Sequence, residues 1–552
     1  MPFFEPKPNP IDNILLCDRN LTSRAKLSTF NSAAEQISLF VRTSMRMITV
    51  CIIAVSCGLL HAEENRPNII IINADDIGYG DFGIYGATKI KTPRIDQLAN
   101  EGMRFTDAHS ASAVCSPSRY ALLTGEYPFR IDLWSPLVTR PLLKRKQLNL
   151  AFLMKEAGYA TACIGKWHLG TGPGSVLERD WNKPLPGGPF DRGFDYFFGI
   201  ADNHSSPPYV YHQNRHIVGY DAEDPLVRQG SKGLRRAKTE EIAEKGNPHF
   251  YVGADKAHSI YRHDQHGIKT TTKAVSWMKQ QKGKPFFLYF PTINIHHPFT
   301  PAPRFVGTSD AGRYGDFVHE LDWIVGEVVD ALDEMGVTDN TLIILTSDNG
   351  AMLNLGGQDA WRAGHRLNGD LLGFKFGVWE GGHRVPFIVK WPGKVKPKRV
   401  CDHLISNLDV LATLAEVLER PLKADEGQDS KSLLPILLDP DHGPIRDELV
   451  LSPFQKKNIG IRKGDWVYIS SRGDGGFGGR EIGHPGLAGP YASRLTNQVN
   501  SDFENYNFKQ DAPNEQLYNL KTDPSQKSNL VREKPELAKR LRERLAHYGF
   551  KP

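Results

Sequence analysis

Strand-like apolar runs alternate with helix-like segments between residues 68 and 392, and this alternation restricts the fold more than any other feature of the sequence. Apolar residues also recur at helical spacing from Phe317 to Met335, directly before one of these runs. Such alternation predicts an α/β sheet flanked by helices. The predicted strands lie at 68–72 (NIIII), 160–164, 285–290, 341–345 and 386–391.

The character of the sequence changes near residue 395. Beyond it come short strand-like runs, a glycine-rich stretch at 472–490 and a predicted terminal helix at 535–547. A chain of this length favours more than one structural unit. We therefore expect a catalytic domain at 63–395 and a smaller C-terminal α+β subdomain at 396–552.

A short apolar segment at 48–60 follows a basic flank. His61 and Ala62 come after it, and then two glutamates. These features are typical of a signal peptide, and the segment is too short for a comfortable transmembrane helix. Because it starts late, we expect translation to begin at Met45 or Met47, so that 1–62 combines an extension with the signal. The chain is then secreted or periplasmic, with no integral membrane span; a lipoprotein anchor is an alternative.

Charge and cysteine content exclude two classes of protein. The formal net charge of +5 over 552 residues is too small and too dispersed to predict a nucleic-acid partner. Of six cysteines, only Cys115, Cys163 and Cys401 follow the predicted signal, so no disulfide framework is expected. An odd cysteine in an exported chain requires a specific explanation.

Acidic and amide side chains follow two of the predicted strands. Asp75 and Asp76 come directly after the first strand, and Asp348 and Asn349 follow the strand that begins at 341. Ligands of open α/β sheets bind beyond the carboxyl ends of the strands. Either pair alone would fit a capped turn or helix, but together they form an oxygen-rich set suited to Ca²⁺ or Mg²⁺.

The run Cys-Ser-Pro-Ser-Arg at 115–119 predicts the start of a helix. Pro117 suits the first turn, with Ser116 as the cap and the end near Gly125. Cys115 would then lie at a helix N-terminus that favours an anion, with Arg119 directed to the same end. From these features alone, Cys115 is either a nucleophile of low pKa or a buried structural cysteine.

This run matches the C-x-P-x-R signature of the type I sulfatases, whose cysteine is oxidised to formylglycine. The resemblance extends from residue 68 to about 392, and the stretch LYNLKTDPSQKSNL at 517–530 resembles the last subdomain of the family. It implies an alkaline-phosphatase-like fold with a central mixed sheet, a Ca²⁺ cofactor, and a formylglycine-generating enzyme that matures Cys115.

Further motifs of the family are present in the expected order. The sequence GKWHLG at 165–170 resembles the element that supplies Lys166 and His168, which point the same way on an extended segment. The H-x-P spacing selects His296 rather than its neighbour His297. Lys375 lies five residues before Glu380, which matches the position of the family's substrate lysine.

The substrate-binding end of the site is less well marked. In the family a polar residue often follows the position of Ile200, and Asn203 or His204 takes that place here. The polar stretch 205–280 suggests an irregular insertion over the active face. With Tyr209 and Tyr211 near the rim, it favours a sulfated carbohydrate over a simple aryl sulfate.

The resemblance also implies the role of each residue. Asp75, Asp76, Asp348, Asn349 and residue 115 would hold the cation, and a hydrated formylglycine would attack the sulfate. Arg119, Lys166 and Lys375 would bind sulfate oxygens, His296 would protonate the leaving alcohol, and His168 would accept a proton at the second step. Two alternatives stay open: a formylglycine phosphonate or phosphodiester hydrolase, and a non-catalytic protein that binds sulfated glycans.

Overall fold

The run of isoleucines forms the central strand of a mixed sheet. β1 (Asn68–Ala74) pairs in parallel with β9 (Thr341–Ser347) on one side and with β8 (Phe286–Pro291) on the other. β4 (Ala160–Lys166) and β5 (Tyr196–Ile200) continue the parallel order beyond β8. The carboxyl ends of all five strands therefore meet at one edge of the sheet.

This computed structural model describes residues 66–174, 179–205, 208–226 and 256–550. The predicted signal segment lies outside these residues. Within them, every helix is too short or too polar to cross a membrane.

Short strands complete the sheet, which contains ten strands within the described residues. β10 (Phe387–Lys390) runs antiparallel to β9 and to β2 (Met103–Phe105), and β11 (Arg399–Cys401) adds in parallel to β2. β6 (His212–Gln213) and β7 (His216–Ile217) form the opposite, antiparallel edge. The predicted α/β fold with a mixed central sheet is confirmed.

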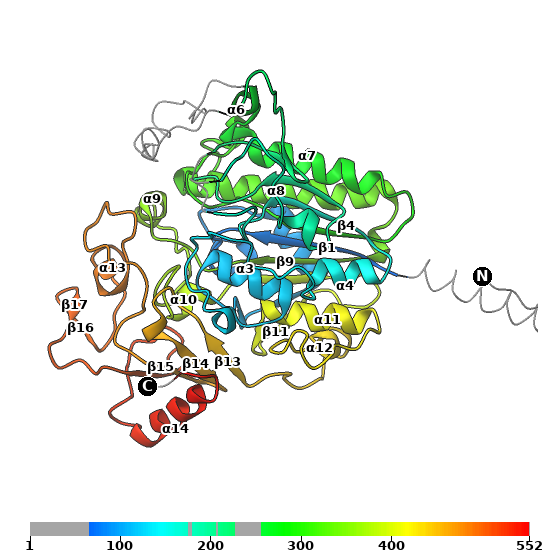
Figure 1. Cartoon of the computed structure of the whole chain (residues 1–552). Coiled ribbons are helices and arrows are strands. Elements are labelled where there is room, and N and C mark those ends of the chain that lie inside the picture. Colours follow the sequence, from blue (N-terminus) through cyan, green and yellow to red (C-terminus); the bar gives the residue numbers. More distant parts are fainter. Residues whose placement is uncertain (1–65, 175–178, 206–207, 227–255, 551–552) are drawn as a thin grey trace, which may run out of the picture. The chain divides into compact units, whose positions relative to one another are not determined.

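Helices cover both faces of this sheet (Figure 1). Ile70 and Ile72 pack in the cluster that holds α7 and α8, whereas Ile69 and Ile71 pack against α3, α4 and α11. Successive side chains of a strand point to opposite faces, so a strand covered on both sides must be apolar at every position. The covering helices are α2 (Pro93–Asn100), α3 (Cys115–Thr124), α4 (Leu150–Glu156), α7 (His266–Lys279), α8 (Gly312–Met335), α11 (Val410–Val417) and α12 (Leu434–Leu438).

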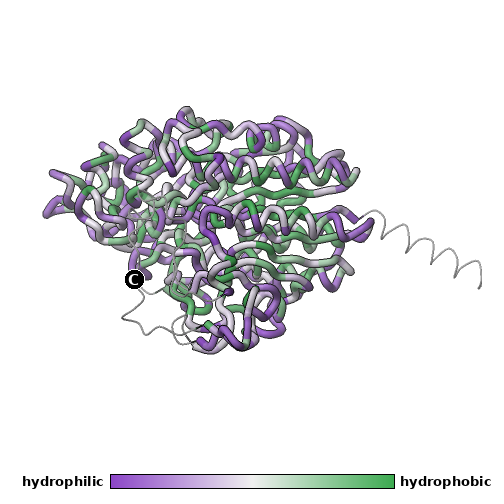
Figure 2. Tube along the Cα trace, turned by 90° about the horizontal axis from the view of Figure 1, so that it is seen from above, coloured by the Kyte–Doolittle hydropathy of each residue, from purple (hydrophilic) through white to green (hydrophobic). Residues whose placement is uncertain are grey.

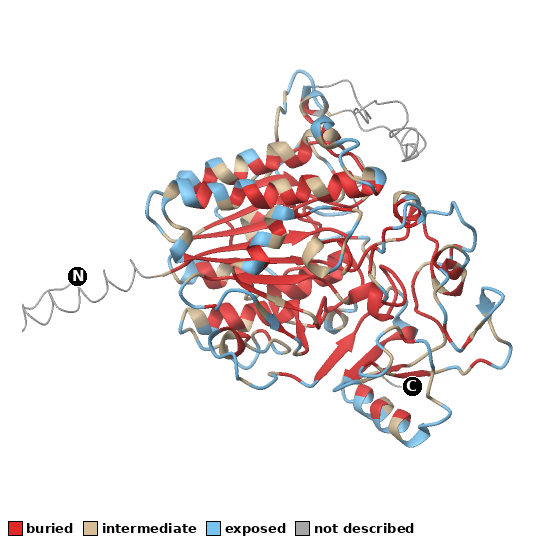
Figure 3. Cartoon of the chain, turned by 180° about the vertical axis from the view of Figure 1, so that it is seen from behind, coloured by how far each residue is buried: buried red, intermediate tan, exposed pale blue. Residues whose placement is uncertain are grey.

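Hydrophobic residues accordingly concentrate along the strands and the inward faces of these helices (Figure 2). The central strands are buried along their whole length, while the outer helix faces are exposed (Figure 3). The predicted amphipathic helix up to Met335 is confirmed as α8. The prediction of irregular structure throughout 205–280 is wrong, because α7 packs against β4 and β8 as part of the core; residues 227–255 lie outside the described part.

A second, antiparallel sheet forms the C-terminal part. Its strands are β13 (Glu448–Leu451), β14 (Gly460–Lys463), β15 (Trp466–Ile469) and β18 (Gln516–Asn519), and α14 (Pro535–Ala546) packs on it. It begins later than the expected boundary at 396. Residues 399–401 pair with the first sheet, and α11 and α12 cover that sheet as well.

Buried ion pairs join the two sheets. Arg462 on β14 donates to Asp107 (2.6 Å), and Arg384 bonds both Asp107 (2.9 Å) and Glu380 (2.7 Å). Glu380 begins the short helix α10 (Glu380–His383). Burial alone would raise the pKa of Glu380, but the charge of Arg384, with smaller contributions from neighbouring histidines and Arg462, lowers it to about 2.

We expect Glu380→Gln to lower the free energy of unfolding at pH 7 by about 3 kcal/mol, because the folded state favours the carboxylate by this pKa shift. A lowered pKa stabilises above the pKa of the unfolded chain, so the difference from wild type should shrink as the pH falls from about 4.5 towards 2. Urea unfolding at several pH values measures it. Glu543→Gln, at an exposed position on α14, is the control; a difference that stays constant with pH would contradict the assignment.

Candidate active site

Acidic residues meet where β1 and β9 end. Ala74 pairs with Ser347, so the residues that follow the two strands lie next to each other. Carboxylate oxygens of Asp75, Asp76 and Asp348 lie within 4.8 Å of one another, and all three side chains are buried. The structure thus brings together the acidic residues that were predicted from the strand ends.

Several oxygens of this group are left without a hydrogen-bond donor. Among the described residues, none donates a hydrogen bond to Asp75 Oδ1, Asp76 Oδ2 or Asn349 Oδ1. The Asn349 amide nitrogen donates to Asp76 Oδ1 (2.8 Å), which fixes the orientation of the amide group. Buried polar atoms normally have partners. A set of metal ligands made only of oxygens fits a hard cation such as Ca²⁺.

Three basic side chains surround the carboxylates. Lys166 donates to Asp75 Oδ2 (2.6 Å), and Lys375 bonds Asp76 Oδ1. The Arg119 guanidinium bonds Asp348 Oδ2 through Nε (2.8 Å). All three predicted sulfate-binding cations are therefore present, although each pairs with a carboxylate.

The carboxylates do not share one ionisation state. Burial disfavours the charge of Asp75, but Lys166 and Arg119 outweigh it and hold its pKa below the usual range. Burial and the charge of Asp75, against the opposing effect of Arg119, raise the pKa of Asp348 to about 7. Ionising all three neighbouring carboxyl groups costs free energy, because their negative charges repel. A divalent cation would offset this repulsion and stabilise the three carboxylates.

A close strand contact positions Lys166. Gly165 precedes it with a φ of 129°, and a Cβ there would lie 2.0 Å from the carbonyl oxygen of Pro291. Only glycine allows β4 to approach the end of β8 this closely. The contact places Lys166 at the edge of the sheet where the acidic residues gather.

Cys115 lies at the start of α3, as predicted, but the helix begins differently. Val114 is the N-cap residue and no described side chain caps the helix, so the prediction of Ser116 as the cap is wrong. The helix ends at Gly125, as predicted. Burial raises the pKa of the Cys115 thiol, while Lys375 and Lys166 act against this effect. An unmodified Cys115 would therefore not be an activated thiolate.

His168 follows β4 in a left-handed backbone conformation, with φ 55°. The ring is buried, and its Nδ1 has no hydrogen-bond partner among the described side chains. Burial and the charges of Lys166 and Arg119 hold the pKa of His168 well below its usual value. His168 is therefore a neutral imidazole, able to accept a proton.

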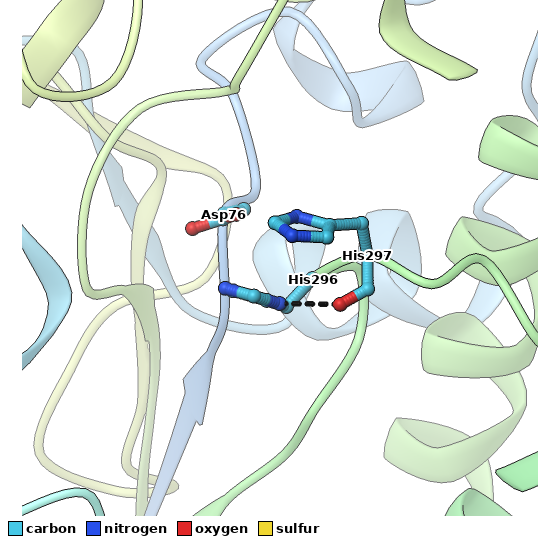
Figure 4. A group of neighbouring side chains, drawn as sticks. All are labelled: Asp76, His296 and His297. Carbon is cyan, nitrogen blue, oxygen red and sulfur yellow. Dashed lines mark hydrogen bonds between the residues drawn. The ribbon is translucent and has the colours of Figure 1, made fainter. Parts of the chain in front are cut away.

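Two histidines lie beside Asp76 in the segment that follows β8 (Figure 4). His296 donates from Nδ1 to the carbonyl oxygen of its neighbour His297 (2.6 Å), and the rings stack with centroids 4.4 Å apart. His296 Nε2 contacts the Asn203 amide nitrogen (3.1 Å). Burial, together with the charge of Lys166, keeps the pKa of His296 well below the usual value.

Of the residues expected near the substrate end of the site, Asn203 and His204 contact His296, whereas Tyr209 and Tyr211 pack in the core. His204 is fully buried, and its Nε2 contacts the carbonyl oxygen of Pro298 (3.4 Å). Tyr209 and Tyr211 are also buried and pack with Tyr261. These tyrosines form part of the core. The His204 ring packs edge-to-face on His296, with the ring centroids 5.3 Å apart, and Asn203 contacts the same histidine.

A cavity missed by the sequence analysis adjoins the histidines. It has a volume of about 450 Å³, and His297, Phe299, Met352 and Phe477 lie in its wall. Part of the wall comes from the glycine-rich stretch 472–490. This stretch carries no catalytic motif, so its sequence contained no signal for a role in the site.

Comparison with known proteins identifies the family of this chain. The family model described as Sulfatase matches residues 67–419. An N-acetylgalactosamine-6-O-sulfatase of Bacteroides thetaiotaomicron is 35% identical, covering 88% of this chain and 93% of the relative. Human arylsulfatase A is 32% identical over 73% of each chain.

Solved structures agree. A 6S-sulfatase from a study of glycosaminoglycan metabolism by Bacteroides thetaiotaomicron superposes with a TM-score of 0.72 at 34% identity, covering 88% of this chain and 99% of the other. A sulfatase from Pseudoalteromonas superposes with a TM-score of 0.64 at 25% identity, covering 90% and 92%. The family model spans more than half of the chain and encloses the acidic residues, Cys115 and the three cations, and the chain belongs to the sulfatase family.

Proposed function

We propose that this chain is a calcium-dependent sulfatase that removes sulfate from a sulfated carbohydrate, with Cys115 matured to formylglycine. The observation that supports this most is the convergence of oxygen ligands, Cys115 and three cations at one edge of the sheet. The relatives include an enzyme named for a sulfated amino sugar, which favours a carbohydrate over an aryl sulfate.

The oxygens of Asp75, Asp76, Asp348 and Asn349 would hold the cation, next to residue 115. Calcium together with an aldehyde at residue 115 would supply an activated hydroxyl nucleophile and withdraw charge from the sulfate oxygens. The raised pKa of the unmodified thiol supports maturation, because the cysteine itself is a poor nucleophile. We propose that a formylglycine-generating enzyme carries it out.

The three basic side chains bind the sulfate group in this proposal. Once a divalent cation compensates the carboxylates, Arg119, Lys166 and Lys375 have donors to spare for sulfate oxygens. Their burial removes competing water, so each contact is stronger than it would be at the surface. They stabilise the charge that develops as the ester bond breaks.

The two histidines transfer protons at different places. His296 uses Nδ1 to bond the His297 carbonyl, so Nε2 is the nitrogen that delivers a proton to the leaving oxygen. A bound anionic ester would favour the protonated form of His296; in the resting site the Asn203 amide nitrogen contacts the same Nε2 (3.1 Å). His168, neutral and with a free Nδ1, is the proton acceptor that restores the resting enzyme.

Secretion or export to the periplasm is part of the proposal, because the basic and apolar pattern before Ala62 has the form of a signal peptide. The proposed maturation of Cys115 needs no disulfide bond. The three cysteines within the described residues are free. N-terminal sequencing of the mature protein would test the cleavage after residue 62.

Two measurements test the proposed activity. Mass spectrometry of the peptide containing residue 115 should show the aldehyde, and the purified protein should release sulfate from sugar sulfates faster than it cleaves matched phosphonate esters. Faster cleavage of the phosphonates would identify the phosphonate hydrolase alternative. An unmodified cysteine without turnover would favour a protein that only binds sulfated glycans.

We expect Asp348→Asn to weaken Ca²⁺ binding by about tenfold or more, because calcium affinity depends on the charge of the ligand set. Calcium titration of chelator-treated protein, followed by thermal unfolding, measures this without turnover, since a bound ion raises the Tm. Asp330→Asn, at an exposed position on α8, is the control. An equal calcium-induced rise in Tm for wild type and Asp348→Asn would remove Asp348 from the cation site.

A further inference from the structure

We propose that the cavity beside His297 binds the sugar of the substrate, that it selects an uncharged sugar, and that His484 donates a hydrogen bond to that sugar. This inference rests on the proposed sulfatase activity and extends it to the substrate class. It adds a loop of the C-terminal part of the chain to the substrate-binding wall, beside the stretch that follows Ile200.

The cavity lies directly beside the reacting groups. His297, in its wall, stacks on His296. Met352, also in the wall, follows Ala351, whose carbonyl oxygen accepts a hydrogen bond from the Lys375 backbone (2.8 Å). These contacts place the cavity next to His296 and Lys375, where the leaving group would lie in the proposed reaction.

The residues that line the cavity favour an uncharged ligand. Of the described residues in its wall, none is an aspartate, glutamate, lysine or arginine. Apolar side chains from Phe299, Met352, Leu355, Phe477 and Pro485 face polar groups of Asn354 and the two histidines. An unpaired charge is costly to place in such a site, whereas a sugar has apolar faces and neutral hydroxyls. The volume of about 450 Å³ is in the usual range for ligand pockets, about 300–1,000 Å³.

A backbone contact fixes the tautomer of His484. Its Nδ1 accepts a hydrogen bond from the backbone N–H of Gly486 (3.0 Å). In the neutral ring, Nε2 must then carry the hydrogen. No other hydrogen bond of this ring is present in the described structure. His484 thus offers an N–H donor to a hydroxyl or acetamido oxygen of a sugar.

The loop that carries His484 is held in place before any substrate binds. The buried Gln358 side chain, on α9 (Leu355–Arg362), accepts from Gly483 N–H (2.8 Å) and donates to the His484 carbonyl oxygen (2.9 Å). Gly479 N–H bonds the Gly486 carbonyl (3.0 Å) and closes the loop. A wall fixed in this way loses little entropy on binding, which favours selectivity.

The experiment compares His484→Ala with His484→Gln, whose amide nitrogen can replace the Nε2 donor. We expect His484→Ala to lower kcat/KM for N-acetylgalactosamine 6-sulfate by about fivefold to tenfold, mainly through KM, as for loss of one neutral hydrogen bond. His484→Gln should recover most of this loss. For 4-nitrophenyl sulfate, which has no sugar hydroxyls, the loss should be at least about threefold smaller.

Wild type should prefer N-acetylgalactosamine 6-sulfate over glucosamine 2-N,6-O-disulfate by about tenfold or more, because the second sulfate would enter an uncharged wall. His442→Ala, at a partly exposed histidine outside the cavity wall, is the control and should match wild type. The inference fails if His484→Ala equals wild type on N-acetylgalactosamine 6-sulfate, or if it loses as much activity on 4-nitrophenyl sulfate as on this sugar sulfate. It also fails if wild type prefers the disulfate. A wild-type protein inactive on every sulfate ester would instead overturn the proposed sulfatase activity, and this inference with it.

Discussion

Cys115→Ala should lower kcat/KM by about 10⁴-fold or more, because the change removes the nucleophile, and catalysts that act through a covalent step lose this much without it. Cys115→Ser should fail as well in a host that matures only cysteine. The thiol is buried and its pKa is raised, so the unmodified residue offers no second route to turnover. Release of sulfate from a sugar sulfate under single-turnover conditions measures the loss.

Cys401→Ala is the matched control. Cys401 is also a buried free cysteine, but it lies on β11, the edge strand at the other side of the sheet from β4. Its removal should leave turnover at the wild-type level. Calcium titration of Cys115→Ala would show that the rest of the site is intact. Wild-type turnover by Cys115→Ala would exclude a nucleophile at this position.

The second large effect concerns the two histidines, whose substitution should cost about 10²–10⁴-fold each, with different dependence on the leaving group. His296→Ala should affect sugar and alkyl sulfates most, because an alkoxide needs a proton to leave. Aryl sulfates should lose less, since a phenolate leaves without one. His168→Ala should lower steady-state turnover of both classes, because His168 acts after the alcohol has left.

Rapid mixing separates these roles. His168→Ala should release a burst of alcohol of at most one equivalent per enzyme, followed by slow turnover, whereas His296→Ala should show no burst with sugar sulfates. The His297→Ala variant distinguishes the two neighbouring rings: if it shows the leaving-group dependence expected for His296, the H-x-P spacing selected the wrong histidine. A burst-free, steady reaction of His168→Ala would assign the second proton transfer to another group.

Local sequence was enough to bring the proposed metal ligands together, because these residues directly follow strands. Asp75 and Asp348 stand immediately after apolar runs, and parallel strands bring their carboxyl ends together whatever the rest of the chain does. The Cys115 helix and its end at Gly125 also depend on neighbouring residues alone. These positions could be predicted from the sequence, with the family resemblance supplying their chemistry.

Whether a polar side chain is buried depends on contacts distant in sequence. The sequence did not predict the burial of the tyrosines that follow Ile200. Tyr211 was expected near the rim of the substrate pocket, and it is buried among aromatic residues because α7 folds back over β4 and β5. Burial is a property of the packed molecule, since the same composition suits a surface loop and a polar pocket in the core.

The substrate wall shows the same limit most clearly. His484 lies more than a hundred residues from Gln358, and only the tertiary fold lets that glutamine hold its loop beside His297. A glycine-rich stretch has no periodicity that indicates its partner, because its conformation is set by the surfaces on which it rests. The sequence by itself determined which acidic residues meet at the strand ends. The tertiary structure alone decided which residues line the neighbouring cavity, because its wall is assembled from segments brought together by packing.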